Sequence, residues 1–123
     1  MTVTVTSTEI AQFRSELANF PEALVALDAI EDCEGDLEDA AIGLAIQAGQ
    51  EPDRSDRWLA GLAGRCRHII CQDEFMASAT PGLAALLVPA LATSAVIPPR
   101  LATSVALYVV KTGIHNFCGL GKE

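Results

Sequence analysis

PGLAALLVPALATSAVIPPRLATSVALYVV, residues 81–110, is the most apolar stretch of the chain and contains a single charged residue, Arg100. A membrane-spanning helix needs about 20 uninterrupted apolar residues, and two consecutive prolines divide this stretch into shorter pieces. Proline cannot continue a helix but is well suited to begin one. We therefore predict no transmembrane segment but two buried helices, at about 81–95 and 99–112, with the remaining helices packed around them.

Residues that start and stop helices divide the rest of the chain into further short helices. Ser7 or Thr8 is predicted to cap the first helix, and Pro21 to begin the second. Gly35 is predicted to end the second helix and Asp36 to cap the third. This pattern predicts an all-α, single-domain bundle of about five to seven short helices. The expected boundaries are a flexible tail at 1–7 and one domain at 8–123, with an acidic three-helix unit at 8–49 packed on 54–118.

The charges of the 123-residue chain are unevenly distributed along it. Residues 1–53 hold 12 acidic residues and one basic residue, whereas residues 54–123 hold four acidic and seven basic residues, within a net charge of −8. Nucleic-acid binding requires an excess of Lys and Arg, so this balance argues against a nucleic-acid partner. The asymmetry also allows one half to attract the other, within one chain or between two subunits.

Cysteine usage and the first residues of the chain indicate a location. The start of the chain shows no basic segment followed by an apolar run, so no secretory signal is visible. The four cysteines are irregularly spaced, and a chain of this length does not need disulfides to hold a core. These observations predict a reducing environment, the cytoplasm.

The spacing H-x-x-C occurs twice, and the residues concerned are His68, Cys71, His115 and Cys118. Residues three apart share one face of a helix. Two such faces, placed opposite each other, would supply two imidazoles and two thiolates to a tetrahedral zinc ion. The favoured interpretation is that these cysteines are small buried apolar residues and that the chain holds no cofactor, with zinc as the alternative.

A second cluster of candidate residues is basic and aromatic: Arg54, Arg57, Trp58, Arg65 and Arg67. Arginine binds carboxylates and phosphates with two parallel hydrogen bonds, so the cluster is a candidate patch for an anion or an acidic protein partner. The favoured alternative is that these arginines form ion pairs with the acidic half of the same chain.

Residues 8–49 resemble a UBA-type three-helix unit. The residues that carry the resemblance are Asn19-Phe20-Pro21 at the first loop, Leu24, Leu27 and Ile30 in the second helix, and Glu34-Gly35-Asp36-Leu37-Glu38-Asp39-Ala40 at the entry to the third. The resemblance covers about a third of the chain and implies three short helices and a ubiquitin-like protein partner. Ala18-Asn19 stand where the family's binding loop has Met-Gly.

Motifs of known enzyme families are absent from the chain, which has no G-x-S-x-G, H-E-x-x-H or phosphate-binding glycine pattern. The leading hypothesis is therefore a non-enzymatic helical domain for protein–protein interaction that associates with a second copy of itself. One alternative is a small protein that binds zinc or another small ligand through the two H-x-x-C segments. A second alternative is attachment to a membrane surface through residues 81–110.

Overall fold

The two predicted apolar helices form the centre of the molecule. The computed structural model describes residues 4–47, 49, 58–76 and 82–119, and it contains α7 (Leu83–Ala92) and α8 (Pro99–Thr112). Both helices begin and end within a few residues of the predicted bounds. Within the described residues, no helix is both long enough and apolar enough to cross a lipid bilayer.

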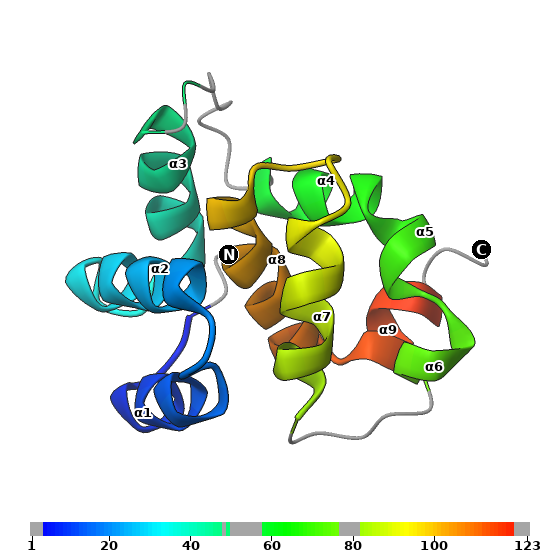
Figure 1. The fold of residues 1–123 in the computed structure, drawn as a ribbon, viewed down its shortest axis with the longest axis horizontal. Coiled ribbons are helices and arrows are strands. Elements are labelled where there is room, and N and C mark those ends of the chain that lie inside the picture. The colour runs from blue at the N-terminus through cyan, green and yellow to red at the C-terminus, as the bar shows by residue number, and fades with distance from the viewer. Residues whose placement is uncertain (1–3, 48, 50–57, 77–81, 120–123) are drawn as a thin grey trace.

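Helix α8 is the axis around which the other helices are arranged (Figure 1). It packs against α2 (Pro21–Asp32), α3 (Leu37–Gln47), α4 (Trp58–Arg65) and α7, and it continues into α9 (Ile114–Gly119). Every residue of α8 between 101 and 107 is buried. A helix that is apolar on most of its circumference must be covered on all sides. The remaining helices of the same chain supply this cover, which confirms the all-α bundle.

Side-chain caps set the ends of the N-terminal helices. Helix α1 (Ser7–Glu16) is capped by Thr6, whose hydroxyl accepts the backbone N–H of Glu9, and the Glu9 carboxylate accepts the Thr6 N–H in return. The predicted cap at Ser7 or Thr8 was therefore wrong by one or two residues. Asp36 caps α3 as predicted, because its carboxylate accepts the N–H of Asp39 at 3.1 Å.

The segment before α1 is packed against the turn between α2 and α3. The Val5 N–H donates to the Gly35 carbonyl at 2.8 Å, Thr4 forms an isolated antiparallel bridge with Asp36, and Val5 is 3% exposed. Gly35 has φ +87°, and a Cβ there would collide with the Val5 carbonyl oxygen. The predicted flexible tail at 1–7 was therefore wrong for residues 4–7, and residues 1–3 lie outside the described part.

The chain breaks its helix at Cys66, although the apolar spacing of Leu59, Leu62, Cys66 and Ile69 continues through this position. Helix α4 ends at Arg65, and two single-turn helices follow, α5 (Arg67–Ile70) and α6 (Asp73–Met76). The break raises the number of helical segments in the described residues above the five to seven expected. It also turns the chain so that α5 lies beside α9, at the opposite end of the molecule from α2 and α3 (Figure 1).

Candidate functional site

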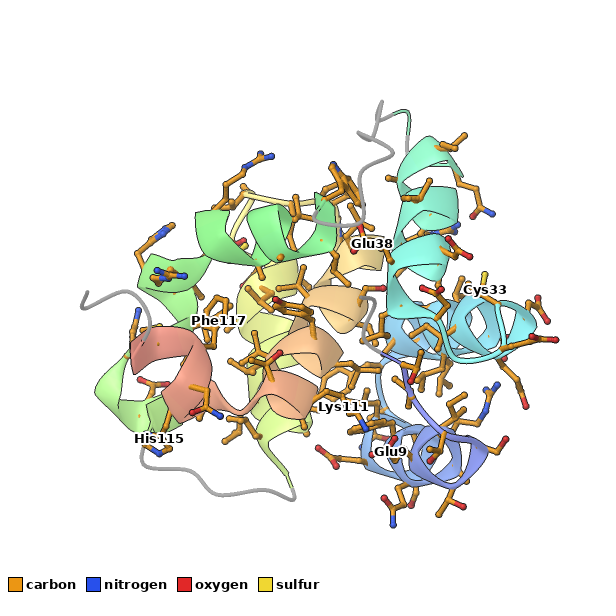
Figure 2. The ribbon with its side chains drawn as sticks, turned by 180° about the vertical axis from the view of Figure 1, so that it is seen from behind. Glu9, Cys33, Glu38, Lys111, His115 and Phe117 are labelled. Atoms are coloured by element: carbon orange, nitrogen blue, oxygen red, sulfur yellow. A yellow bond between two sulfur atoms is a disulfide. The ribbon has the colours of Figure 1, made fainter. Side chains whose placement is uncertain are left out.

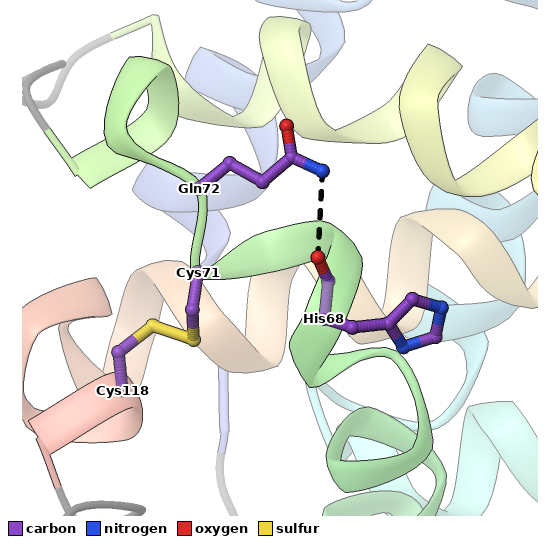
Figure 3. Close-up of a disulfide and its surroundings, with 4 residues drawn as sticks. All are labelled: His68, Cys71, Gln72 and Cys118. Atoms are coloured by element: carbon purple, nitrogen blue, oxygen red, sulfur yellow. Dashed lines mark hydrogen bonds between the residues drawn. A yellow bond between two sulfur atoms is a disulfide. The ribbon is translucent and has the colours of Figure 1, made fainter.

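The two H-x-x-C segments meet, and their cysteines are covalently joined. Cys71, at the end of α5, and Cys118, in α9, form a disulfide whose Cα atoms lie 5.7 Å apart (Figure 3). The bond links positions separated by 47 residues. The expectation that the chain would keep its cysteines reduced was therefore wrong for this pair, because the packing of α5 against α9 brings the two side chains together.

The two histidines do not complete the predicted zinc set. His68 is exposed, and its imidazole is directed away from the disulfide (Figure 3), while His115 is also exposed. Cys71 is the C-terminal cap of α5, with φ −91° and ψ 35°, so it does not continue the helical face that carries His68. In the described part of the chain, no three His, Cys, Asp or Glu side chains are grouped to hold a metal ion. The structure thus corrects the assignment of His68, Cys71, His115 and Cys118 as four ligands, because the sulfur atoms bond each other.

The disulfide also bears on the predicted location. Disulfides persist mainly in oxidising compartments and are rare in the cytosol. The cytoplasmic location stays a prediction, but the argument from unpaired cysteines no longer supports it.

The other two cysteines are free thiols with little nucleophilic character. Burial raises the pKa of the Cys66 thiol, although nearby Arg65 acts in the opposite direction. Burial also raises the pKa of Cys33, and the carboxylates of Asp39 and Asp36 reinforce the effect. The thiolate is the reactive form of cysteine, so both side chains are protonated and unreactive at neutral pH.

The predicted basic and aromatic patch is not a single site in the structure. Arg54 and Arg57 lie outside the described residues. Trp58 and Arg65 occupy opposite ends of α4, about 10 Å apart along the helix axis. Arg67 lies over the ring of Phe117 at 5.0 Å, and its buried Nε atom has no hydrogen-bond partner within the described residues. Arg67 is therefore a cation–π partner of α9.

Ion pairs connect the two halves of the chain, but the basic residues that form them are not the arginines of the predicted patch. Lys111 on α8 pairs with Glu9 on α1 at 2.7 Å, and these side chains point toward one another in Figure 2. Arg100 at the start of α8 pairs with Glu22 on α2 at 3.1 Å. Among the described residues, Arg65 and Arg67 form no such pair. The acidic and basic parts of the chain thus pair with each other within one molecule. Each exposed ion pair contributes about 0.2–1 kcal/mol to the stability of the fold.

Helix α7 carries an exposed apolar surface that the sequence-based interpretation treated as buried. We call it the α7 outer face, and it consists of Ala85, Leu86, Pro89 and Ala90 of the helix and of its C-cap residue, Thr93. Leu86 is 47% exposed, Thr93 is exposed, and the other three are half-buried. Figure 1 shows α7 on the near side of α8. No charged residue occurs between Gly82 and Pro99.

No family model, curated protein or solved structure matches this chain. The resemblance of residues 8–49 to a UBA-type unit stays a prediction, and the helices α1, α2 and α3 occupy that segment.

Proposed function

We propose that the chain is a non-enzymatic helical interaction domain that associates with a second copy of itself through the α7 outer face. The observation that carries this proposal is an uncharged, half-exposed helix on the surface of a chain whose net charge is −8. Surface helices of globular proteins normally present charged or polar side chains to water. A contiguous apolar face that lacks them is typical of a docking surface.

A second copy is the partner that fits the charge distribution best. Residues 4–47 carry ten acidic side chains and one basic side chain, Arg14, so two copies repel each other at the surfaces of α1, α2 and α3. The α7 outer face has no charge and meets its own copy without repulsion. A two-fold contact requires one patch that complements itself, and the small side chains of Ala85 and Ala90 allow two helices to approach closely.

The expected affinity is modest. Complete burial of one leucine side chain contributes about 1.5–3 kcal/mol, and Leu86 is already partly covered in the single chain. Association also costs translational and rotational freedom. We therefore expect a dimer with a dissociation constant on the order of 100 µM.

Sedimentation velocity with two matched variants tests the proposal. Leu86→Glu places a charge on the α7 outer face, and Ile46→Glu places the same charge on α3, where the side chain is 52% exposed. We expect the wild-type chain and Ile46→Glu to sediment as dimers at about 500 µM, and Leu86→Glu to stay monomeric because two carboxylates would face each other.

Either of two results would overturn the proposal. One is a wild-type chain that is monomeric at every concentration up to about 500 µM. The other is an equal loss of association in Ile46→Glu, which would indicate general charge repulsion. If the wild-type monomer instead binds lipid vesicles and Leu86→Glu does not, the α7 outer face is a membrane-attachment surface.

A further inference from the structure

Helix α9 is a short helix whose position depends on few attachments. It has six residues, whereas an isolated helix of fewer than about 12–15 residues is marginal in water. Its main contacts are with α8 and α5. Fixing the backbone of one residue costs a free energy comparable to that gained by burying one apolar side chain, and α9 buries three, Ile114, Phe117 and Cys118. Packing alone therefore holds α9 weakly.

Gly113 is the single residue between α8 and α9. Its φ is +93° and its ψ is 122°, a backbone conformation that glycine adopts readily and other residues rarely. Its N–H donates to the Val109 carbonyl at 2.8 Å and so completes the last turn of α8. Hinges are residues at the end of an element that absorb a large change in φ and ψ. Rotation at Gly113 would move α9 as a unit and leave α8 intact.

The contact between α9 and α5 contains an unsatisfied polar group. Arg67 lies over one face of the Phe117 ring, and the Tyr108 ring meets the same ring edge-on, with 6.4 Å between the centroids. The Arg67 Nε atom is buried and has no hydrogen-bond partner among the described residues. A buried donor without a partner costs at least as much free energy as a cation–π contact contributes. The arginine contact therefore adds little to the attachment of α9.

We propose that the Cys71–Cys118 disulfide is a redox-controlled latch, which keeps α9 packed on α5 and α8 and whose reduction releases α9 by rotation at Gly113. The covalent bond is the strongest attachment of α9, and Cys118 lies at the end of the helix that is remote from the hinge. Release exposes the Phe117 ring, which is 5% exposed while the bond is intact. The latch shares no residue with the α7 outer face and does not depend on self-association.

The reductant of the latch is a dithiol, and Cys71 is the more accessible of the two cysteines. Cys71 is half-buried, whereas Cys118 is 7% exposed. One thiolate of the dithiol attacks the Cys71 sulfur, the S–S bond breaks, and Cys118 leaves as a thiolate that takes up a proton. The second thiolate of the dithiol then attacks the mixed disulfide and releases Cys71. Two electrons and two protons pass to the protein, and the dithiol becomes a disulfide.

Alkylation of the full chain with iodoacetamide, read by mass spectrometry, tests the proposal. In urea, the chain purified in air should take up alkyl groups at Cys33 and Cys66 only, and at all four cysteines after treatment with dithiothreitol. In the reduced chain without urea, Cys118 should react within about tenfold of its rate in urea, because α9 is open. Cys66 is fully buried and should react at least about a hundredfold more slowly than in urea, because the core stays folded.

Two single serine variants separate the latch from the general loss of a cysteine. Cys71→Ser leaves Cys118 without its partner, so Cys118 should react rapidly without any reductant. Cys33→Ser keeps the bond, and Cys118 should stay unreactive until dithiothreitol is added. Treatment of the reduced wild-type chain with oxidised glutathione should restore the protection of Cys118, as a reversible latch requires.

Three results would overturn the latch. Alkylation of all four cysteines before reduction would show that the bond is absent. Protection of Cys118 as strong as that of Cys66 after reduction would show that packing alone holds α9. Loss of the protection of Cys66 on reduction would show that the bond holds the whole fold rather than α9. None of these results bears on self-association, which is measured by sedimentation.

Discussion

The N-terminal helices and helix α7 bury their apolar residues in different ways. In residues 4–47, leucine, isoleucine and alanine side chains lie in the core, while of the ten acidic residues only Glu38 is buried. Helix α7 is buried on one side, but its outer face is uncharged and Leu86 remains 47% exposed. Charge keeps the first region apart from its copies, whereas the second has no such barrier. The comparison identifies α7 as the surface that can meet a partner.

The N-terminal helices also differ from the opposite end of the molecule, formed by α5 and α9, in how they are held to the rest of the chain. The N-terminal helices are attached to α8 by packing and by the exposed pairs Glu9–Lys111 and Glu22–Arg100. The far end is attached by a covalent bond between α5 and α9. Both regions nevertheless pack on one central helix, so we expect them to unfold as one unit.

The largest expected effect comes from removing a side chain of α8 that both regions share. Leu107 is fully buried, and Leu107→Ala should lower the free energy of unfolding by about 2–5 kcal/mol, through lost burial and the cavity that remains. Urea denaturation followed by circular dichroism measures it. Val25→Ala, at a position that is 40% exposed, is the control and should change stability by less than about 0.5 kcal/mol. Equal losses in the two variants would contradict the central position of α8.

A smaller effect is expected from the disulfide. Cys71→Ser combined with Cys118→Ser should lower the free energy of unfolding by about 2–4 kcal/mol, because the bond closes a long loop. A reducing agent should destabilise the wild-type chain by the same amount and leave the double variant unchanged. Cys33→Ser, at a free thiol, serves as the control. A wild-type chain that is insensitive to reduction would contradict a stabilising role of the disulfide.

The smallest effect concerns the attachment of α1 to α8. The pKa of Glu9 is lower in the folded chain than in the unfolded chain. The ionised carboxylate therefore stabilises the fold at any pH above the pKa of the unfolded chain, and this stabilisation is lost as the pH falls through the pKa of the folded chain. Glu9→Gln should be about 0.5 kcal/mol less stable than the wild type at neutral pH and equally stable near about pH 2. Denaturation at both pH values measures the difference. A difference that does not depend on pH would show that the charge of Glu9 contributes nothing.

Local rules predicted most of the helices because the chain marks their ends clearly. Pro21, Asp36 and Pro99 each begin or cap a helix, and these signals act within a few residues of the helix end. The pairing of Val5 with Gly35 was missed because it joins segments that are distant in sequence. The break at Cys66 was missed because the apolar spacing continues through it without proline.

The candidate sites depended on tertiary arrangement, and spacing alone misplaced them. The two H-x-x-C segments lie close together, but their spacing did not distinguish a disulfide from a metal site. That distinction depends on whether His68 and Cys71 share one helical face, which the cap geometry at Cys71 prevents. The α7 outer face was missed because a uniformly apolar stretch does not reveal which of its sides the other helices leave uncovered.

Sedimentation equilibrium of the wild-type chain at low and high salt tests the central claim most directly. If two α7 outer faces form the contact, the dimer should persist or tighten between about 0.05 M and about 1 M NaCl, because salt screens the repulsion between acidic surfaces and does not weaken an apolar contact. A chain that is monomeric at both salt concentrations would contradict self-association. A dimer that dissociates in high salt would place the contact at charged side chains rather than at Leu86 and its neighbours.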